Sequence, residues 1–283
     1  MSWREYSVDA EFQFNPQANP AIDAKAEFAR RAELSASARR RMRGELDVRY
    51  GPGARQLLDI FPAGDGRGPI HMYIHGGYWR MGDKGSQSLL AEPFVNAGIA
   101  CVFPGYDLCP QVSLDQIVAE VLDAIEWTFR NGARIGDPSR LYLSGSSAGA
   151  HLCAMALAHD WSSRGLPGDL VKGATLLTGI YDLEPVLDIS INKLVNLTQD
   201  RVRDNSPVHH PPRRRLPLLM EVGGNEPPGW QAQTFEFADV CRTAGCDVEV
   251  LVLPGETHFS ILRSLAQADH PLTKAMIAQM LGG

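Results

Sequence analysis

The sequence has no long apolar run and no excess of positive charge. None of its 283 residues fall in an apolar stretch of 18 or more, whereas a membrane-spanning helix needs about 20 such residues. Its first residues show no basic segment followed by an apolar run, so no secretory signal is indicated and we expect a cytoplasmic protein. The 27 Lys and Arg against 33 Asp and Glu give a net charge of -6. Neither nucleic acid nor a membrane is therefore an expected partner.

Cysteine is scarce and odd in number, which excludes a disulfide framework. We predict buried free thiols at all five positions, which are Cys101, Cys109, Cys153, Cys241 and Cys246. His209 and His210 have no Cys, His or carboxylate at ligand spacing on a regular element nearby, so no metal site is predicted. With 44% apolar and 21% charged residues, the composition is that of an ordinary globular protein.

Residues 1–44 are predicted to form an N-terminal helical segment that contributes to a lid. Good helix formers fill residues 21–42, but the apolar stripe of this helix is thin. We interpret its arginine group as a solvated helix end rather than an anion site. The group consists of Arg39, Arg40, Arg41 and Arg43.

Residues 45–283 read as one α/β domain. Two antiparallel edge strands are predicted at 46–50 and 56–61, followed by strands at 70–74, 99–103, 140–143, 174–177, 218–222 and 248–253. Predicted helices lie between or after them at 113–131, 148–159, 231–244 and 259–281. This alternation predicts a mostly parallel eight-stranded sheet with helices on both faces. Residues 181–215 interrupt the alternation, and we interpret them as an insertion that completes the lid.

The sharpest local signal is a G-x-S-x-G motif at residues 145–149. A strand-like run ends just before it and a helical run begins at Ala148, so Ser147 is placed on a tight strand-to-helix turn. Such a turn presents a serine hydroxyl as a nucleophile, with glycines beside it because their neighbours pack closely. We predict that Ser147 is catalytic.

Two glycines follow the first inner strand at Gly76 and Gly77. Backbone N–H groups there could approach a substrate carbonyl, and with the N–H of Ala148 they would form an oxyanion hole. For the preceding His75 we favour a structural role in shaping this loop.

The general base is predicted to be His258. In the α/β-hydrolase order the base follows the nucleophile, and His258 lies in a loop directly after the last strand. Glu226 follows the previous strand and is our preferred acid for orienting the histidine. Asp182, which follows the strand before that, remains the alternative.

At these motifs the chain resembles the arylformamidase, or kynurenine formamidase, branch of the α/β-hydrolases, near the hormone-sensitive-lipase type esterases. The resemblance lies in residues 75–79 (HGGYW), 106–110 (YDLCP), 150–152 (AHL) and 257–259 (THF). It departs from the family at Ser146, where members often have His, and at Glu226, where the acid is often Asp. The resemblance implies an α/β-hydrolase fold, hydrolysis of N-formylkynurenine or similar aryl formamides, activity on activated esters, and neither metal nor organic cofactor.

The function predicted is therefore a serine hydrolase acting on a small amide or ester, most of all an aryl formamide. Tyr78 and Trp79 could supply a flat apolar wall for the aryl group, or could instead pack beneath the lid. A carboxylesterase of other substrate range is the first alternative, and a non-catalytic hydrolase-fold binding protein is the second. The partner expected is the small-molecule substrate, and a homodimer is left open.

Overall fold

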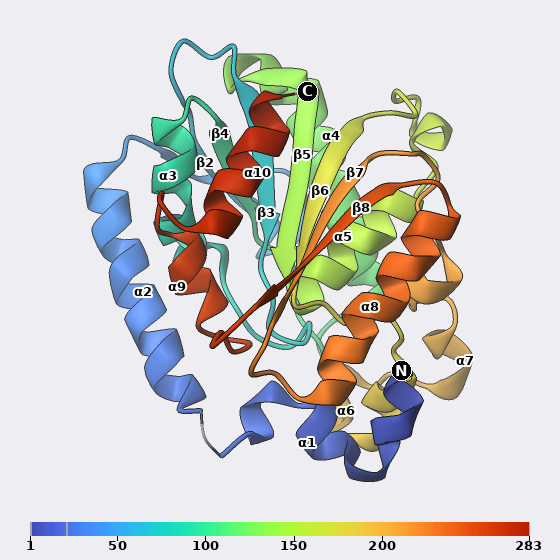
Figure 1. Cartoon of the computed structure of the whole chain (residues 1–283). Coiled ribbons are helices and arrows are strands. Elements are labelled where there is room, and N and C mark those ends of the chain that lie inside the picture. The colour runs from blue at the N-terminus through green and yellow to red at the C-terminus, as the bar shows by residue number, and fades with distance from the viewer. Residues whose placement is uncertain (1, 21, 283) are drawn as a thin grey trace.

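The computed structural model describes residues 2–20 and 22–282 and contains a central eight-stranded sheet (Figure 1). Residue 21, where the predicted first helix was placed to begin, lies outside the described residues. The strands are β1 (Glu45–Arg49), β2 (Leu57–Phe61), β3 (Pro69–Ile74), β4 (Ala100–Pro104), β5 (Asp137–Ser146), β6 (Val171–Leu177), β7 (Pro217–Gly223) and β8 (Asp247–Leu253).

The strand order is β1-β2-β4-β3-β5-β6-β7-β8. β2 pairs antiparallel with both β1 and β4, and the other neighbouring pairs are parallel. The predicted fold class, including its antiparallel N-terminal edge, is confirmed. Because the strands from β3 to β8 run parallel, their carboxyl ends meet at one edge, where ligands bind in sheets of this kind.

Two apolar cores lie on opposite faces of the sheet. Along β3, Met72 belongs to one core and the next residue, Tyr73, to the other, as side-chain alternation along a strand requires. The first core is covered by α4 (Leu114–Asn131), α5 (Ala148–Ala158) and α8 (Pro228–Thr243). The second is covered by α3 (Ala91–Asn96), α9 (Ile261–Leu265) and α10 (Pro271–Leu281). The sheet is thus enclosed between helical layers (Figure 1).

The C-terminal helix predicted at 259–281 is wrong as a single element, since α9 and α10 are separate helices. Pro271 is the reason: it lacks an N–H and disfavours helical backbone at the residue before it. His270 accordingly has extended backbone, and its side chain caps α10 by accepting from the N–H of Leu272 at 3.3 Å. The prediction also missed the 3-10 helix η3 (Lys84–Leu90) and α3.

The N-terminal segment carries more structure than its composition indicated. Besides the predicted helix, observed as α2 (Ala24–Arg41), it forms η1 (Trp3–Asp9), α1 (Ala10–Phe14) and η2 (Pro16–Ala18). In Figure 1, α2 runs along one side of the domain, whereas α1 lies at the end where α6 and α7 are found.

The interpretation of the arginine group as a solvated helix end is wrong for Arg39 and holds for Arg41, which stays exposed in the last turn of α2. The guanidinium of Arg39 lies 2.9 Å from a carboxylate oxygen of Asp59, which is fully buried in β2, and it also donates to Ser88 at 2.9 Å. Arg41 pairs with Glu92 of α3 at 2.6 Å. Both ion pairs join α2 to the hydrolase domain.

Residues 181–215 form four short helices, η6 (Glu184–Asp188), α6 (Asn192–Val195), α7 (Gln199–Val202) and η7 (Pro207–His209). They pack against the start of the chain. Glu11 accepts from the backbone N–H and the hydroxyl of Ser190, both at 2.7 Å, and Arg4 pairs with Glu184 at 2.7 Å. The insertion and the N-terminal turns therefore support each other at one end of the molecule.

All five cysteines are free and buried, as predicted. Among residues 2–20 and 22–282, no cluster of three or more His, Cys, Asp or Glu side chains could hold a metal ion, and Nε2 of His210 lies 3.0 Å from the carbonyl of Arg203 instead. None of the helices described has the length and apolar character needed to span a membrane.

One buried carboxyl group has no partner. Glu221 of β7 is fully buried, and neither of its carboxylate oxygens has a hydrogen-bond partner. Burial, and then the nearby carboxylates of Glu226 and Glu256, raise the pKa of Glu221 well above its usual range. The neutral acid is therefore the form that suits the fold.

This raised pKa predicts how stability depends on pH. The unfolded chain loses the Glu221 proton near pH 4.5, so above that value ionisation favours unfolding and the wild type loses stability as the pH rises. Glu221→Gln stays neutral at every pH. At pH 8 its Tm should exceed that of wild type by several degrees, because each kcal/mol gained in the free energy of unfolding raises Tm by about 2–4 °C. This difference in Tm should shrink towards pH 4.5. Thermal melts monitored by circular dichroism across this range measure it. An increase in Tm that is the same at every pH would contradict the raised pKa of Glu221.

Candidate active site

Ser147 lies on the turn between β5 and α5, where the sequence placed it. Its backbone is in a sparsely populated region, at φ 57° and ψ -122°, and its N–H donates to the carbonyl of Leu177 at 2.9 Å. The motif glycines are required by close packing, because a Cβ on Gly145 would lie 2.5 Å from the backbone of Gly149, and one on Gly149 would lie 2.0 Å from the carbonyl oxygen of Ile74. The turn is therefore strained and enclosed.

The loop after β3 lies directly against this turn. A Cβ on Gly76 would lie 2.5 Å from the carbonyl oxygen of Ser146 and 3.1 Å from the Cβ of Ser147. Gly77 has φ +121°, which L side chains rarely adopt. Ala148 begins α5, so its N–H has no acceptor within the helix. The structure thus brings the three predicted oxyanion-hole residues beside Ser147, and their role remains a prediction.

His75 and the Tyr106 motif hold this loop in place. The imidazole of His75 stacks on the ring of Tyr106 at 4.2 Å, and the Tyr106 hydroxyl donates to the His75 carbonyl at 2.7 Å. The N–H of Cys109 donates to the carbonyl of Trp79 at 2.8 Å. Burial lowers the pKa of His75 to about 4, so this histidine is neutral at physiological pH and acts as a structural part of the loop.

Glu226, and not Asp182, is the carboxylate beside His258. The Nδ1 of His258 lies 2.8 Å from Oε2 of Glu226, and both side chains are buried. The N–H of Gly223 donates to the other carboxylate oxygen at 2.9 Å. Asp182 instead accepts from the indole of Trp3 at 3.0 Å and pairs with Arg4 at 3.0 Å. A carboxylate on Nδ1 leaves Nε2 as the nitrogen available for proton transfer.

Thr178 is a central member of this cluster that the sequence analysis missed. Its hydroxyl lies 2.6 Å from each oxygen of Glu226 and 3.0 Å from Nδ1 of His258, and the indole of Trp230 donates to it at 2.9 Å. Its φ is +41°, an outlier for a β-branched residue. Its place directly after β6, at the same sheet edge as Glu226, was the signal that could have found it.

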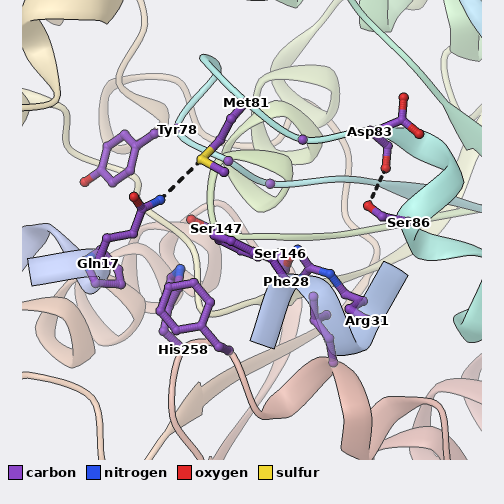
Figure 2. Close-up of a pocket in the computed structure, with 16 residues that line it drawn as sticks. Gln17, Phe28, Arg31, Tyr78, Met81, Asp83, Ser86, Ser146, Ser147 and His258 are labelled. Atoms are coloured by element: carbon purple, nitrogen blue, oxygen red, sulfur yellow. Dashed lines mark hydrogen bonds between the residues drawn. The ribbon is translucent and has the colours of Figure 1, made fainter. Parts of the chain in front are cut away.

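Ser147 and His258 line one cavity of about 220 Å³ (Figure 2). Apolar side chains from Phe28, Phe259 and Leu262 form much of its wall. The N-terminal segment contributes Pro16, Gln17, Phe28 and Arg31 to the lining, whereas none of the lining residues falls within 181–215.

The two aromatic residues after the glycines have different positions. Tyr78 lines the cavity, and its hydroxyl donates to the carbonyl of Phe14. Trp79 is not among the residues that line the cavity: its side chain is fully buried, and the indole donates to Nδ1 of His151 at 3.2 Å, which favours the packing role left open for it. His151 in turn lies 2.7 Å from the carbonyl of Asn205. Trp79 and His151 therefore join the loop to residues 181–215.

Comparison with known proteins shows the family to which this chain belongs. Residues 71–262 match the alpha/beta hydrolase fold family, which defines the class. A kynurenine formamidase of Danio rerio is 32% identical over 99% of this chain and 98% of its own, and one of Salmo salar is 33% identical over 83% and 81%. A candidate thioesterase from Silicibacter sp. superposes with a TM-score of 0.83 at 27% identity, covering 96% of this chain and 98% of its own. The chain belongs to the kynurenine formamidase branch of the α/β-hydrolases.

The choice between the two acids predicts unequal effects of neutral substitution. Glu226→Gln should lower kcat by about 10³- to 10⁴-fold, because the amide does not stabilise the imidazolium that forms during proton transfer. Asp182→Asn should leave kcat within about threefold and reduce stability, because it weakens the contact with Arg4. Steady-state kinetics and melting of both variants test this. The reverse pattern would make Asp182 the acid.

The contacts of the Thr178 hydroxyl predict different effects for its replacement by valine and by serine. Thr178→Val removes the hydroxyl that contacts both Glu226 and Nδ1 of His258, so the imidazole should be held less well and kcat should fall about tenfold while KM stays near the wild-type value. Thr178→Ser keeps the hydroxyl and should resemble wild type. Steady-state kinetics of both variants test this, and a valine variant with wild-type kcat would refute this positioning role.

Proposed function

We propose that this protein is a serine hydrolase that cleaves a small aryl formamide such as N-formylkynurenine, with Ser147 as nucleophile, His258 as general base and Glu226 as orienting acid. The observation that carries the proposal is the shared cavity: Ser147 and His258 line it together, while the imidazole is held from behind by Glu226 at 2.8 Å. A small-molecule amide is the partner that such a cavity accommodates.

The proposed chemistry has two halves. His258 takes the proton of Ser147 as its oxygen attacks the formyl carbon, and the N–H groups of Gly76, Gly77 and Ala148 hold the charge on the carbonyl oxygen. The imidazolium then gives the proton to the departing aniline nitrogen as the C–N bond breaks. Water, deprotonated by the same histidine, attacks the formyl ester, releases formate and restores the serine.

Cavity size and wall chemistry favour this substrate class. A volume of about 220 Å³ lies below the roughly 300–1,000 Å³ usual for drug-sized ligands, so a small substrate with a short acyl group is favoured. The apolar wall suits an aromatic ring. The names of the Danio and Salmo relatives point to the same amide bond.

The N-terminal segment is proposed to act with the hydrolase domain as a cover for this site. Residues 45–283 supply the proposed catalytic residues, and residues within 1–44 supply part of the cavity wall. In this proposal residues 181–215 brace the cover through Glu11 and Arg4 and do not close over the cavity themselves.

A carboxylesterase is the second candidate, because the chain is also 30% identical to the esterase LipQ of Mycobacterium tuberculosis over 236 residues. LipQ is longer, and the match spans 56% of it. The same catalytic residues would serve both reactions, so the leaving group decides between them.

Turnover of N-formylkynurenine and p-nitrophenyl acetate by purified protein tests the proposal. We expect the formamide to be cleaved with the higher kcat/KM, and Ser147→Ala to lose at least about 10³-fold on both substrates. Ser139→Ala, an exposed serine at the other end of β5, is the matched control and should equal wild type. An inert formamide with a rapidly cleaved ester would favour the esterase. No turnover, with no fluorophosphonate labelling of Ser147, would favour a binding protein.

A further inference from the structure

The cavity contains a cationic side chain to which the proposed chemistry gives no task. Arg31 extends from α2 into the cavity lining, in view of Ser147 and His258 (Figure 2). Its Nε is buried and has no hydrogen-bond partner, and within residues 2–20 and 22–282 its guanidinium forms no ion pair. The guanidinium carbon lies 5.2 Å from the centre of the Phe28 ring. Arg31 is partly buried, and burial lowers its pKa despite the nearby charge of Glu27; a partly desolvated charge with no ion pair is costly, so it points to a missing anion.

The nearby carboxylates are engaged elsewhere. Glu27, one helical turn before Arg31, lies 3.2 Å from Nε of Arg263. Asp83 also lines the cavity, but it accepts from the N–H of Gly85 at 2.7 Å and faces Arg55 at 3.8 Å. By contrast with Arg31, Arg39 lies two turns further along α2 and forms an ion pair with the buried carboxylate of Asp59.

The charged side chains that line the cavity lie on one side of the proposed nucleophile. In Figure 2, Arg31, Asp83 and Ser86 lie on one side of Ser147, whereas Gln17 and Tyr78 lie on the other. Phe28 and Phe259 provide apolar surface in the same cavity. A substrate that fits this pattern has an aromatic body and an anionic group at one end.

We propose that Arg31 binds the carboxylate of the substrate, and that the enzyme prefers aryl formamides carrying an amino-acid group over neutral ones. This inference rests on the proposed function and specifies its substrate class. A guanidinium can donate two parallel hydrogen bonds to a carboxylate, and a water-poor apolar cavity strengthens that contact. N-formylkynurenine has such a carboxylate at the far end of its side chain from the formamide. The N-terminal helix would then supply a specificity residue as well as part of the cover.

The test compares a substrate that has the amino-acid group with one that lacks it. Arg31→Gln is assayed with N-formylkynurenine and with 2-formamidoacetophenone, which keeps the ring, ketone and formamide but lacks the amino-acid group. We expect kcat/KM for N-formylkynurenine to fall about 10- to 100-fold, mainly through KM, the loss expected for hydrogen bonds to a charged group. For the neutral substrate it should change less than about threefold. Arg30→Gln, the exposed neighbour on α2, is the matched control and should leave both unchanged.

Binding of the product kynurenine gives a second readout that does not depend on turnover. In the Ser147→Ala background, calorimetry should show kynurenine affinity falling by a similar factor when Arg31→Gln is added, with Tm preserved. Equal losses on the charged and neutral formamides, or unchanged kynurenine affinity, would overturn this inference and leave the proposed function standing. A wild type that cleaves neither formamide but cleaves esters would overturn both.

Discussion

The contact between the imidazole of His258 and the buried carboxylate of Glu226 is the interaction on which the proposed chemistry depends. It exists because β6, β7 and β8 are adjacent and parallel, so the residues following each strand meet at one edge. Thr178 follows β6, Glu226 follows β7, and His258 follows β8. Donors from the Thr178 hydroxyl and the Gly223 N–H compensate the carboxylate, which would otherwise be costly to bury.

A second constraint is the close approach of two backbones. The turn at Ser147 and the loop at Gly76 come so near each other that neither motif glycine nor Gly76 has room for a side chain. The same closeness places the backbone of Gly76 beside the Cβ of Ser147. Strain at the turn is sustained by the surrounding packing, with His75 and Tyr106 stacked behind the loop.

The N-terminal segment connects substrate choice to the rest of the fold. Its helix α2 is attached by charge, through Arg39 to Asp59, rather than by a broad apolar face. This leaves the side of α2 near the cavity free to present Phe28 and Arg31. The proposed catalytic residues follow strands of the sheet, whereas part of the cavity wall, made by Pro16, Gln17, Phe28 and Arg31, belongs to this segment.

The sequence by itself determined the fold class, the turn at Ser147, the loop at Gly76 and Gly77, and the loop at His258. Each follows from a short local pattern of glycines, strand formers and helix formers. Only the tertiary structure decided that Glu226 rather than Asp182 faces His258, that Thr178 joins them, that Trp79 is buried, and that Arg31 rather than residues 181–215 reaches the cavity. These outcomes depend on contacts between segments tens to hundreds of residues apart. Local patterns set where a chain turns, but not which distant side chain it meets there.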